Sequence, residues 1–251
     1  MKPVSIIGAG SGELEMMTIK GYRRLLEADV ILYDALLRPS IIEAFPSQAE
    51  TLFVGKRCGK HAFTQSMISE VMLDRSQKGK HVVRLKGGDP SLFAHLAEEI
   101  AALKAANIPY EIVPGVSAAS AAAAHFGVPL TERGKVSNVW ITDGHNKNLS
   151  QLVPQMAKFS GTLVFYMAAG RIREILQSLI HHGIDTDISA LIVESALSRD
   201  ARQFAFTLKT FLEENIALPA FTGPTILLVG SALCNAIESL SDPIYAHTAQ
   251  F

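Results

Sequence analysis

Short β-branched runs alternate with longer segments of helical period through the first half of this 251-residue chain. The order begins with an apolar run at Val4–Ile7, followed by Met16–Leu26, whose apolar residues recur at intervals of three and four. Further strands are expected at Val30–Tyr33, Thr51–Val54, Val82–Leu85 and Tyr110–Val113, and further helices at Thr64–Gln77 and Phe93–Ala106. A strand-then-helix order of this kind predicts a mainly parallel sheet with helices on both faces.

The second half keeps an α/β character but changes its strand pattern. A stretch of small residues follows Pro114-Gly115, which favours a domain boundary at this point. New strands are expected at Val139–Thr142, Thr162–Tyr166, Ile188–Val193 and Thr225–Val229. Gln203–Thr207 alternates in a way that is typical of an antiparallel strand, so the second sheet is predicted to be mixed. We therefore expect two α/β domains, 1–114 and 115–251.

Charge and cysteine content exclude several classes of protein. Lysine plus arginine (23) nearly equal aspartate plus glutamate (24), so the chain lacks the basic surface that nucleic-acid phosphates require. Cys58 and Cys234 are too few for a disulfide framework, and neither they nor the eight histidines have metal-ligand spacing. We expect a protein of the reducing cytoplasm, with no resident metal and no nucleic-acid partner.

No segment is expected to cross a membrane. The apolar stretch before Glu13 is too short for the core of a signal peptide. Two uncharged runs, 112–131 and 215–237, are long enough to span a bilayer, but each contains two prolines and several glycines or polar residues. Both are expected to form buried strand, loop and helix instead.

A glycine-rich turn, Gly8-Ala9-Gly10-Ser11-Gly12, follows the first strand. Glycines at such a turn let backbone N–H groups approach a ligand that side chains would block. A dinucleotide-binding fingerprint would place its third glycine where Glu13 stands, and only Asp34 could supply the acidic residue after the second strand. A nicotinamide-dependent oxidoreductase and a purely structural turn are both alternatives for this motif.

Two further turns occupy positions where open α/β sheets bind ligands. Gly87-Gly88-Asp89-Pro90 follows the strand at Val82–Leu85, and Asp89 could accept hydrogen bonds from a ribose or an amine. Its alternative role is that of an ordinary turn residue. The stretch Pro114–Ala124 reads as a turn and then a helix capped by Ser117, which would either pack in the core or touch a bulky ligand.

Basic residues gather after the expected strands. They are Lys56, Arg57, Lys60 and His61 in one loop, Arg84 and Lys86 around another strand end, and Arg133 after Pro129-Leu130-Thr131. Such residues are often no more than a solvated surface. Their grouping at expected ligand-facing strand ends favours a polyanionic substrate.

Seven separated segments form an ordered set. They are GAGSGELEMMTIK at 8–20, ADVILYDALL at 28–37, VGKRCGKHAFTQ at 54–65, VVRLKGGDPSLF at 82–93, VPGVSAASAAAAHFGVPLTERG at 113–134, TLVFYM at 162–167 and GPTILLVG at 223–230. Together they resemble the tetrapyrrole methylase family, and within it the members that methylate carbon atoms of uroporphyrinogen III. An ordered match of this length is far less probable by chance than any one glycine turn.

The resemblance implies a two-domain tetrapyrrole methylase-like fold with the ligand cleft between the domains, and a homodimer. It implies S-adenosylmethionine as methyl donor, S-adenosylhomocysteine as product, and conversion of uroporphyrinogen III through precorrin-1 to precorrin-2 for sirohaem or cobalamin synthesis. By position, cofactor contacts fall to Ser11, Gly87, Gly88, Asp89, Leu92, Ser117, Ala118, Met167, Ala196 and Pro224. Asp34 and Lys56 match the family's proton acceptor and proton donor. Arg57, His95, Glu98 and Arg133 are expected to bind the substrate.

Several positions depart from the family pattern. Ser11 stands where proline is usual, Leu14 where proline or a small residue is usual, and Ala35 where arginine is common. The segment His95-Leu96-Ala97 stands where the pattern has Arg-Gly-Gly. Most of these positions belong to the substrate side of the expected site. A later precorrin is therefore an alternative substrate, and a non-catalytic tetrapyrrole- or cofactor-binding homologue is an alternative function.

Overall fold

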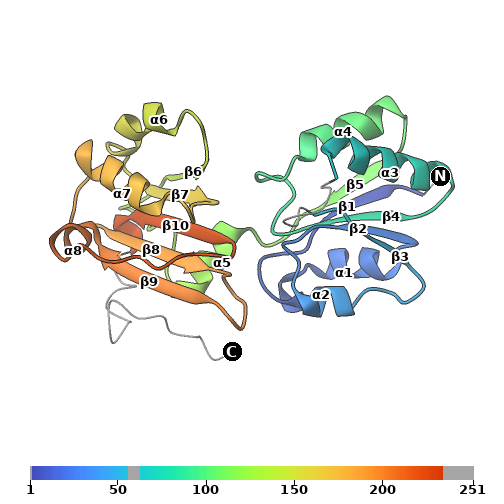
Figure 1. Cartoon of the computed structure of the whole chain (residues 1–251), viewed down its shortest axis with the longest axis horizontal. Helices are drawn as coiled ribbons and strands as arrows, with labels where there is room; N and C mark the ends of the chain where they lie inside the picture. Colours follow the sequence, from blue (N-terminus) through green and yellow to red (C-terminus); the bar gives the residue numbers. More distant parts are fainter. Residues whose placement is uncertain (1, 56–62, 234–251) are drawn as a thin grey trace. The chain divides into compact units, whose positions relative to one another are not determined.

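A computed structural model describes residues 2–55 and 63–233, which form two compact units divided between Ser117 and Ala118 (Figure 1). The sequence placed this division after residue 114. Lys56, Arg57, Lys60, His61 and both cysteines lie outside the described residues. The expected cleft between the domains stays a prediction.

The sheet of the first unit is parallel throughout. Its strands are β1 (Val4–Gly8), β2 (Val30–Tyr33), β3 (Glu50–Phe53), β4 (Val82–Lys86) and β5 (Tyr110–Val113), in the order β3-β2-β4-β1-β5. All four neighbouring pairs are parallel, with β1 between β4 and β5. The predicted parallel sheet is confirmed, and the carboxyl ends of its strands share one edge.

Helices cover both faces of this sheet (Figure 1). They are α1 (Ile19–Leu26), α2 (Pro39–Glu43), α3 (Gln65–Gln77) and α4 (Leu96–Ala105), with a 3-10 turn at Leu14–Met16. Successive residues of β1 enter different cores, since Ile7 packs with Leu25 of α1 and Ile6 packs with Met72 of α3. This alternation explains why the strands are apolar on both faces.

Two predicted helix starts are wrong. The helix expected from Met16 begins at Ile19, where the Thr18 side chain accepts a hydrogen bond from the Gly21 N–H and caps it. The helix expected from Phe93 begins at Leu96, because Phe93 and His95 both have a φ of 54°, which a right-handed helix does not allow.

The sheet of the second unit is mixed, as predicted. Its strands are β6 (Val139–Asp143), β7 (Thr162–Tyr166), β8 (Ser189–Glu194), β9 (Arg202–Thr207) and β10 (Thr225–Gly230), in the order β6-β7-β10-β8-β9. Only the pair β6–β7 is parallel, and β9 pairs antiparallel with β8 as expected. The helices are α5 (Ala118–Phe126), α6 (Leu149–Met156), α7 (Ile172–His181) and α8 (Leu208–Glu213), with a 3-10 turn at Ser231–Leu233.

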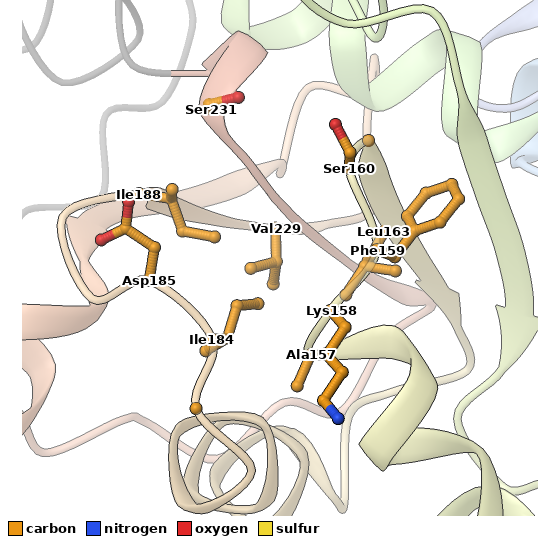
Figure 2. Close-up of a pocket in the computed structure, with 12 residues that line it drawn as sticks. Ala157, Lys158, Phe159, Ser160, Leu163, Ile184, Asp185, Ile188, Val229 and Ser231 are labelled. Atoms are coloured by element: carbon orange, nitrogen blue, oxygen red, sulfur yellow. The ribbon is translucent and has the colours of Figure 1, made fainter.

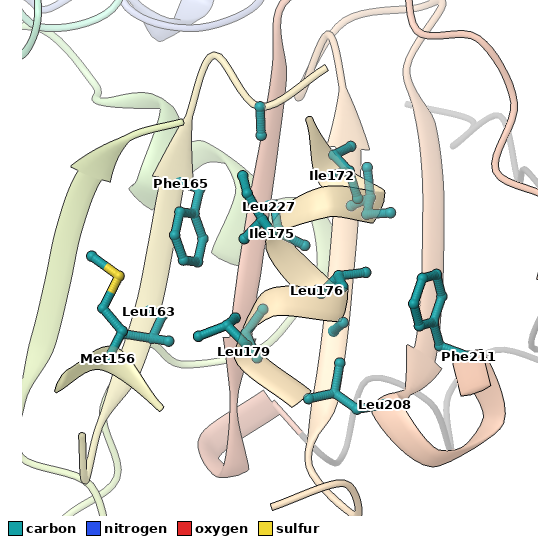
Figure 3. Close-up of a cluster of buried hydrophobic side chains, with 14 of the residues drawn as sticks. Met156, Leu163, Phe165, Ile172, Ile175, Leu176, Leu179, Leu208, Phe211 and Leu227 are labelled. Atoms are coloured by element: carbon teal, nitrogen blue, oxygen red, sulfur yellow. The ribbon is translucent and has the colours of Figure 1, made fainter. Parts of the chain in front are cut away.

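One large apolar core fills the space between this sheet and α6, α7 and α8 (Figure 3). Phe165 and Leu227 point from neighbouring strands toward Ile175 and Leu179 of α7. The alanine-rich α5 contacts β7 and β10, and its small side chains permit close packing. The core therefore fixes the strands whose ends carry the expected cofactor residues.

A partly buried polar cluster lies near the amino ends of the strands in the first sheet. The Ser5 hydroxyl donates to Glu111 Oε1 at 2.9 Å, and Lys20 and Arg24 of α1 pair with the same carboxylate at 2.9 and 2.5 Å. Partial burial alone would raise the pKa of Glu111. The hydrogen bonds from Lys20, Arg24 and Ser5 outweigh burial and lower that pKa from 4.5 to about 2.

Glu111→Gln should lower the free energy of unfolding at neutral pH. It should also make that free energy less dependent on pH in the acid range. Because the pKa of Glu111 is depressed in the folded state, its stabilising contribution is complete above pH 4.5 and is lost as the pH falls toward 2. Urea denaturation of parent and variant across this pH range measures the difference. Equal free energies of unfolding at neutral pH would show that Glu111 contributes no stability.

Candidate functional site

Three backbone segments meet at the carboxyl edge of the first sheet. Gly10 N donates to Gly88 O at 3.2 Å, and Gly88 N donates to Gly10 O at 2.8 Å. A Cβ on Gly8 would lie 2.6 Å from the backbone of both Gly88 and Gly115, and a Cβ on Gly115 would lie 2.3 Å from Gly88 O. No side chain fits at these contacts, so the loops after β1, β4 and β5 require glycine there.

The carboxylate of Asp89 fastens two of these loops together. Its Oδ1 accepts hydrogen bonds from the Ser91 N–H at 2.8 Å and from the Ser91 hydroxyl, and its Oδ2 accepts from Gly115 N–H at 3.0 Å. Partial burial would raise the pKa of Asp89, but the hydrogen bonds from Ser91 and Gly115 lower it below its ordinary value. The turn role considered for Asp89 is present, and any contact with a cofactor would come in addition to it.

Open space lies beside Gly88, in contrast to the packed glycines around it. Its φ is 68°, and a Cβ built there would meet no atom within 4 Å. The backbone is therefore exposed as a cradle that a side chain would fill. Ser11, Gly87 and Leu92 belong to the same loops, and the hydroxyl-bearing Ser11 directly follows Gly10. This cradle fits a ligand that approaches the backbone closely.

A second edge gathers the remaining expected cofactor residues within the second unit. Met167 follows β7, Pro224 precedes β10, and Ala196 follows β8. Because β10 runs antiparallel to both neighbours, these three chain positions share one edge of the sheet. Ser195 N–H donates to Pro224 O at 2.8 Å, and Ala168 N–H donates to Thr225 O at 3.2 Å.

The start of α5 belongs to this same edge. The Ala119 N–H donates to the hydroxyl of Tyr166, the last residue of β7, at 3.0 Å. Ala118 is the first residue of the helix and directly follows Ser117. The structure thus brings Ala118, Met167, Ala196 and Pro224 to one edge of the second unit. Within the first unit, the carboxyl edge of the parallel sheet carries Ser11, Gly87, Gly88, Asp89 and Leu92.

A buried carboxylate supports the Pro224 segment. Glu194 Oε1 accepts hydrogen bonds from Thr222 N–H at 2.6 Å and Gly223 N–H at 2.5 Å, and its Oε2 accepts from Arg202 Nε at 2.6 Å. Burial would raise the pKa of Glu194. The hydrogen bonds from Gly223, Arg202 and Thr222 lower it below its ordinary value, so the carboxylate remains charged where it holds the loop.

Left-handed backbone conformations are concentrated at the two edges. Within the described ranges, seven non-glycine residues have a positive φ: Asn107, Asn215, Phe93, His95, Met167, Ser195 and Leu197. The asparagines are ordinary, because asparagine tolerates this conformation. The other five lie in the loops after β4, β7 and β8, with φ between 54° and 58°. Strain of this kind is typical of functional sites and persists only where surrounding structure enforces it.

Asp34 lies at the carboxyl end of β2, next to β4 in the sheet. Its Oδ1 accepts a hydrogen bond from Leu36 N–H at 3.1 Å, and its Oδ2 lies 3.7 Å from Arg84 Nη2. The side chain is about one-fifth exposed, at 21%. Asp34 therefore holds the turn after β2 and also keeps its carboxylate partly exposed.

The expectation that Arg84 and Lys86 contribute to a basic substrate surface is wrong. Their side chains are only 5% and 4% exposed, and both are paired with Glu99 of α4. Burial and the neighbouring Arg84 guanidinium hold the pKa of Lys86 below its ordinary value, although Glu99 opposes this effect. The two cations lie on the face of β4 that α3 and α4 cover, because they alternate with Val83 and Leu85, which pack on the α1 side.

The expected substrate residues are at the surface where the structure describes them. The His95 and Glu98 side chains are 70% and 56% exposed and pair with each other at 3.1 Å. Arg133 is exposed in the turn that connects the bridged residues Glu132 and Val136. Their role in substrate binding stays a prediction.

Three polar residues that support the candidate site were not identified from the sequence. Glu99, Tyr166 and Glu194 hold parts of the two edges, but each reaches partners far away in the sequence. A signal existed for Glu99, since two cations within an apolar strand require a buried anion. Tyr166 and Glu194 end strands, where a polar residue is unremarkable in sequence.

The described part of the chain also contains a half-open cavity of about 310 Å³ (Figure 2). Phe159 and Gly161 before β7, Ile184 and Ile188 before β8, and Val229 at the end of β10 line it. These positions mark the edge of the second sheet opposite to Met167 and Pro224. The cavity is therefore separate from the candidate site.

Among the residues described, no group of three or more histidines, cysteines or acidic residues is arranged to hold a metal ion. No helix in residues 2–55 and 63–233 has the length and apolar character needed to cross a membrane.

Comparison with known proteins identifies the family. Residues 3–212 match the model of the Tetrapyrrole (Corrin/Porphyrin) Methylases. Siroheme synthase of Ectopseudomonas mendocina (strain ymp) is 39% identical over 232 residues, which are 92% of this chain and 50% of that protein. The chain thus spans about half the length of the curated relatives it matches.

Solved structures agree with this assignment. Uroporphyrin-III C-methyl transferase from Thermus thermophilus, complexed with S-adenyl homocysteine, matches with a TM-score of 0.75 and 33% identity. The match covers 92% of this chain and 98% of that one. A cobalt precorrin-4 methyltransferase matches with a TM-score of 0.81 and 28% identity, over 92% and 95% of the two chains. The chain belongs to the tetrapyrrole methylase family.

Asp89→Ala should destabilise the first unit, because it removes two hydrogen bonds from Ser91 within the turn after β4 and the one that fastens this turn to Gly115. The free energy of unfolding should fall by about 1–3 kcal/mol, as measured by urea denaturation. Ser91→Ala is the matched control, since it removes only the hydroxyl and should cost less. An unchanged unfolding midpoint for Asp89→Ala would show that the carboxylate does not hold the loops.

Proposed function

We propose that this chain is an S-adenosylmethionine-dependent methyltransferase that methylates carbon atoms of uroporphyrinogen III, giving precorrin-2 through precorrin-1. Sirohaem or cobalamin synthesis would consume this product. The observation that carries the proposal is the convergence of Gly8, Gly88 and Gly115 at one edge, with open space beside Gly88. The likeness to a transferase crystallised with S-adenyl homocysteine supports it.

The residues at both edges suit a ligand with polar and apolar parts. The exposed backbone near Gly88 suits the polar groups of a nucleoside, and Met167, with 44% of its surface exposed, offers a polarisable apolar contact. Ser11, Gly87, Asp89, Leu92, Ser117, Ala118, Ala196 and Pro224 complete the proposed cofactor set.

When bound, S-adenosylmethionine supplies an electrophilic methyl group, which the electron pair of a pyrrole carbon takes as the carbon–sulfur bond breaks. The residues of this chain mainly bind and orient the two reactants, and positioning of this kind can lower a barrier by roughly 7–11 kcal/mol. The strained loops at Met167 and Ser195 are suited to this task, because their backbone is fixed before a ligand arrives.

Asp34 is proposed to accept the proton that the methylated macrocycle loses. Methyl transfer leaves one positive charge on the pyrrole ring system, and loss of a proton from the methylated macrocycle to a carboxylate removes that charge. Asp34 is partly exposed at the edge that carries the glycine cradle. Lys56, the proposed proton donor, and Arg57 lie outside the described residues.

Substrate carboxylates require cations at the surface of the site. Arg133 and His95 are both exposed and are proposed to contact them. Arginine offers a permanent, planar pair of donors to a carboxylate, whereas histidine carries its charge only in part near neutral pH. A homodimer in the cytoplasm is also part of the proposal and rests on the sequence.

Incubation of the protein with uroporphyrinogen III and S-adenosylmethionine tests the proposal directly. Mass spectrometry should show a product with two added methyl groups and an intermediate with one. S-Adenosylhomocysteine should raise the melting temperature, because a ligand that binds the folded state stabilises it. Absence of both methylated products, with the protein folded and the cofactor bound, would exclude uroporphyrinogen III as the substrate.

A later precorrin is the second candidate substrate. The cobalt precorrin-4 methyltransferase gives the higher TM-score of the two structures compared, 0.81 against 0.75. The higher sequence identity favours uroporphyrinogen III, 33% against 28%. Methylation of a precorrin, but not of uroporphyrinogen III, in the same assay would favour the second candidate.

Met167→Ala should reduce turnover while leaving the free energy of unfolding nearly unchanged. The side chain is 44% exposed at the end of β7, so its truncation removes little buried surface. Phe165→Ala, two residues earlier and fully buried, is the contrasting variant and should cost about 3–5 kcal/mol. Turnover equal to that of the parent in Met167→Ala would remove this residue from the proposed cofactor set.

A further inference from the structure

Two buried cations occupy one face of β4. Arg84 and Lys86 alternate with apolar residues, so both side chains point toward the face covered by α3 and α4. Both are almost wholly buried, with 5% and 4% of the side chain exposed. Burial of a cation is costly unless an anion compensates it.

Glu99 of α4 compensates both cations through one oxygen atom. Its Oε1 accepts hydrogen bonds from Arg84 Nε at 3.1 Å, Lys86 Nζ at 2.8 Å and Gln65 Nε2 at 3.1 Å. The residue is fully buried, and its Oε2 has no hydrogen-bond partner among the residues the structure describes. One carboxylate is thus shared by two cations.

The charge balance of this cluster is completed at the candidate site. Two cations and one carboxylate leave one positive charge, and the Asp34 carboxylate lies 3.7 Å from Arg84 Nη2. The rest of the guanidinium is fixed, since Nε donates to Glu99 and Nη1 donates to the carbonyl of Leu85 at 3.0 Å. Only Nη2 of Arg84 is directed at Asp34.

We propose that Glu99 is a positioning residue that acts through Arg84 on Asp34. The inference rests on the proposed function, because it takes Asp34 as the proton acceptor. By sharing the guanidinium, Glu99 keeps Arg84 close enough to hold the Asp34 carboxylate in place, but at a distance longer than a direct hydrogen bond. The carboxylate then retains an oxygen that can take a proton.

Removal of the Glu99 charge should strengthen the interaction between Arg84 and Asp34. In Glu99→Gln the amide can still accept a hydrogen bond, but Asp34 becomes the one described ion-pair partner of Arg84. A carboxylate held more tightly by a cation accepts a proton less readily. We expect kcat to fall by about tenfold or more, since a general base contributes on the order of 10²–10⁴ to a rate. The KM values of both substrates should stay within about twofold of the parent values, because Glu99 is not proposed to contact either substrate.

The kinetic test compares Glu99→Gln with Glu99→Asp and Glu111→Gln. Glu99→Asp restores the charge on a shorter side chain and should recover part of the lost kcat. Glu111→Gln removes a carboxylate that also bridges cations, near the amino ends of the same sheet, and should leave kcat unchanged while it lowers stability. Parent-like kcat in folded Glu99→Gln overturns the proposal, as does a loss of activity that matches the fraction of unfolded protein.

A double-mutant cycle with Asp34→Asn tests the network without measuring activity. Loss of both carboxylates leaves Arg84 and Lys86 without either of their described ion-pair partners, so Glu99→Gln combined with Asp34→Asn should destabilise more than the sum of the single variants. Glu111→Gln combined with Asp34→Asn should be additive. Additivity in both cycles would overturn the proposal. A parent enzyme that fails to methylate uroporphyrinogen III, with coupling present in the first cycle, would instead overturn the proposed function.

Discussion

Direct contact between backbone segments is the constraint on which the first unit depends. At the carboxyl edge of its sheet, Gly8, Gly88 and Gly115 approach within distances that leave no room for a Cβ. This contact brings loops from three neighbouring strands together and places Asp89 within reach of Gly115 N–H. A side chain at Gly8 or Gly115 would force the loops apart and separate the residues that form the cradle.

Buried carboxylates fasten the remaining parts of both candidate edges. Glu194 binds the backbone before Pro224, and Glu99 binds the two cations beside Asp34. Each carboxylate lies away from solvent and uses charge-assisted hydrogen bonds, which are stronger than neutral ones. The apolar cores fix the strands, whereas these acidic residues fix the loops that follow or precede them.

Local sequence patterns were sufficient for the strands and for the order of the units, because burial of both sheet faces produces apolar runs of the right length. The mixed second sheet was also predictable, since Gln203–Thr207 has the alternation of an antiparallel strand. The start of α4 was not, because the left-handed conformations of Phe93 and His95 are imposed by the fold and are unusual for their residue types.

The remaining features of the candidate site depend on pairing between side chains from different elements, which local sequence patterns do not reveal. The resemblance assigns the cofactor residues, and the structure brings them to one sheet edge in each unit. Arg84 and Lys86 were misinterpreted because their anion, Glu99, is supplied by a helix that follows in the chain. Only the folded structure identifies which carboxylate neutralises which cation.

The left-handed residues around Met167 and Ser195 have a consequence for the thermodynamics of binding. A loop that is already fixed in one conformation loses little freedom when a ligand arrives, so less of the interaction energy is consumed by ordering. The sheet and core of the second unit supply that order during folding, at the expense of some stability. A change that relaxes these loops would make association more unfavourable in entropy, even if every contact with the ligand were kept.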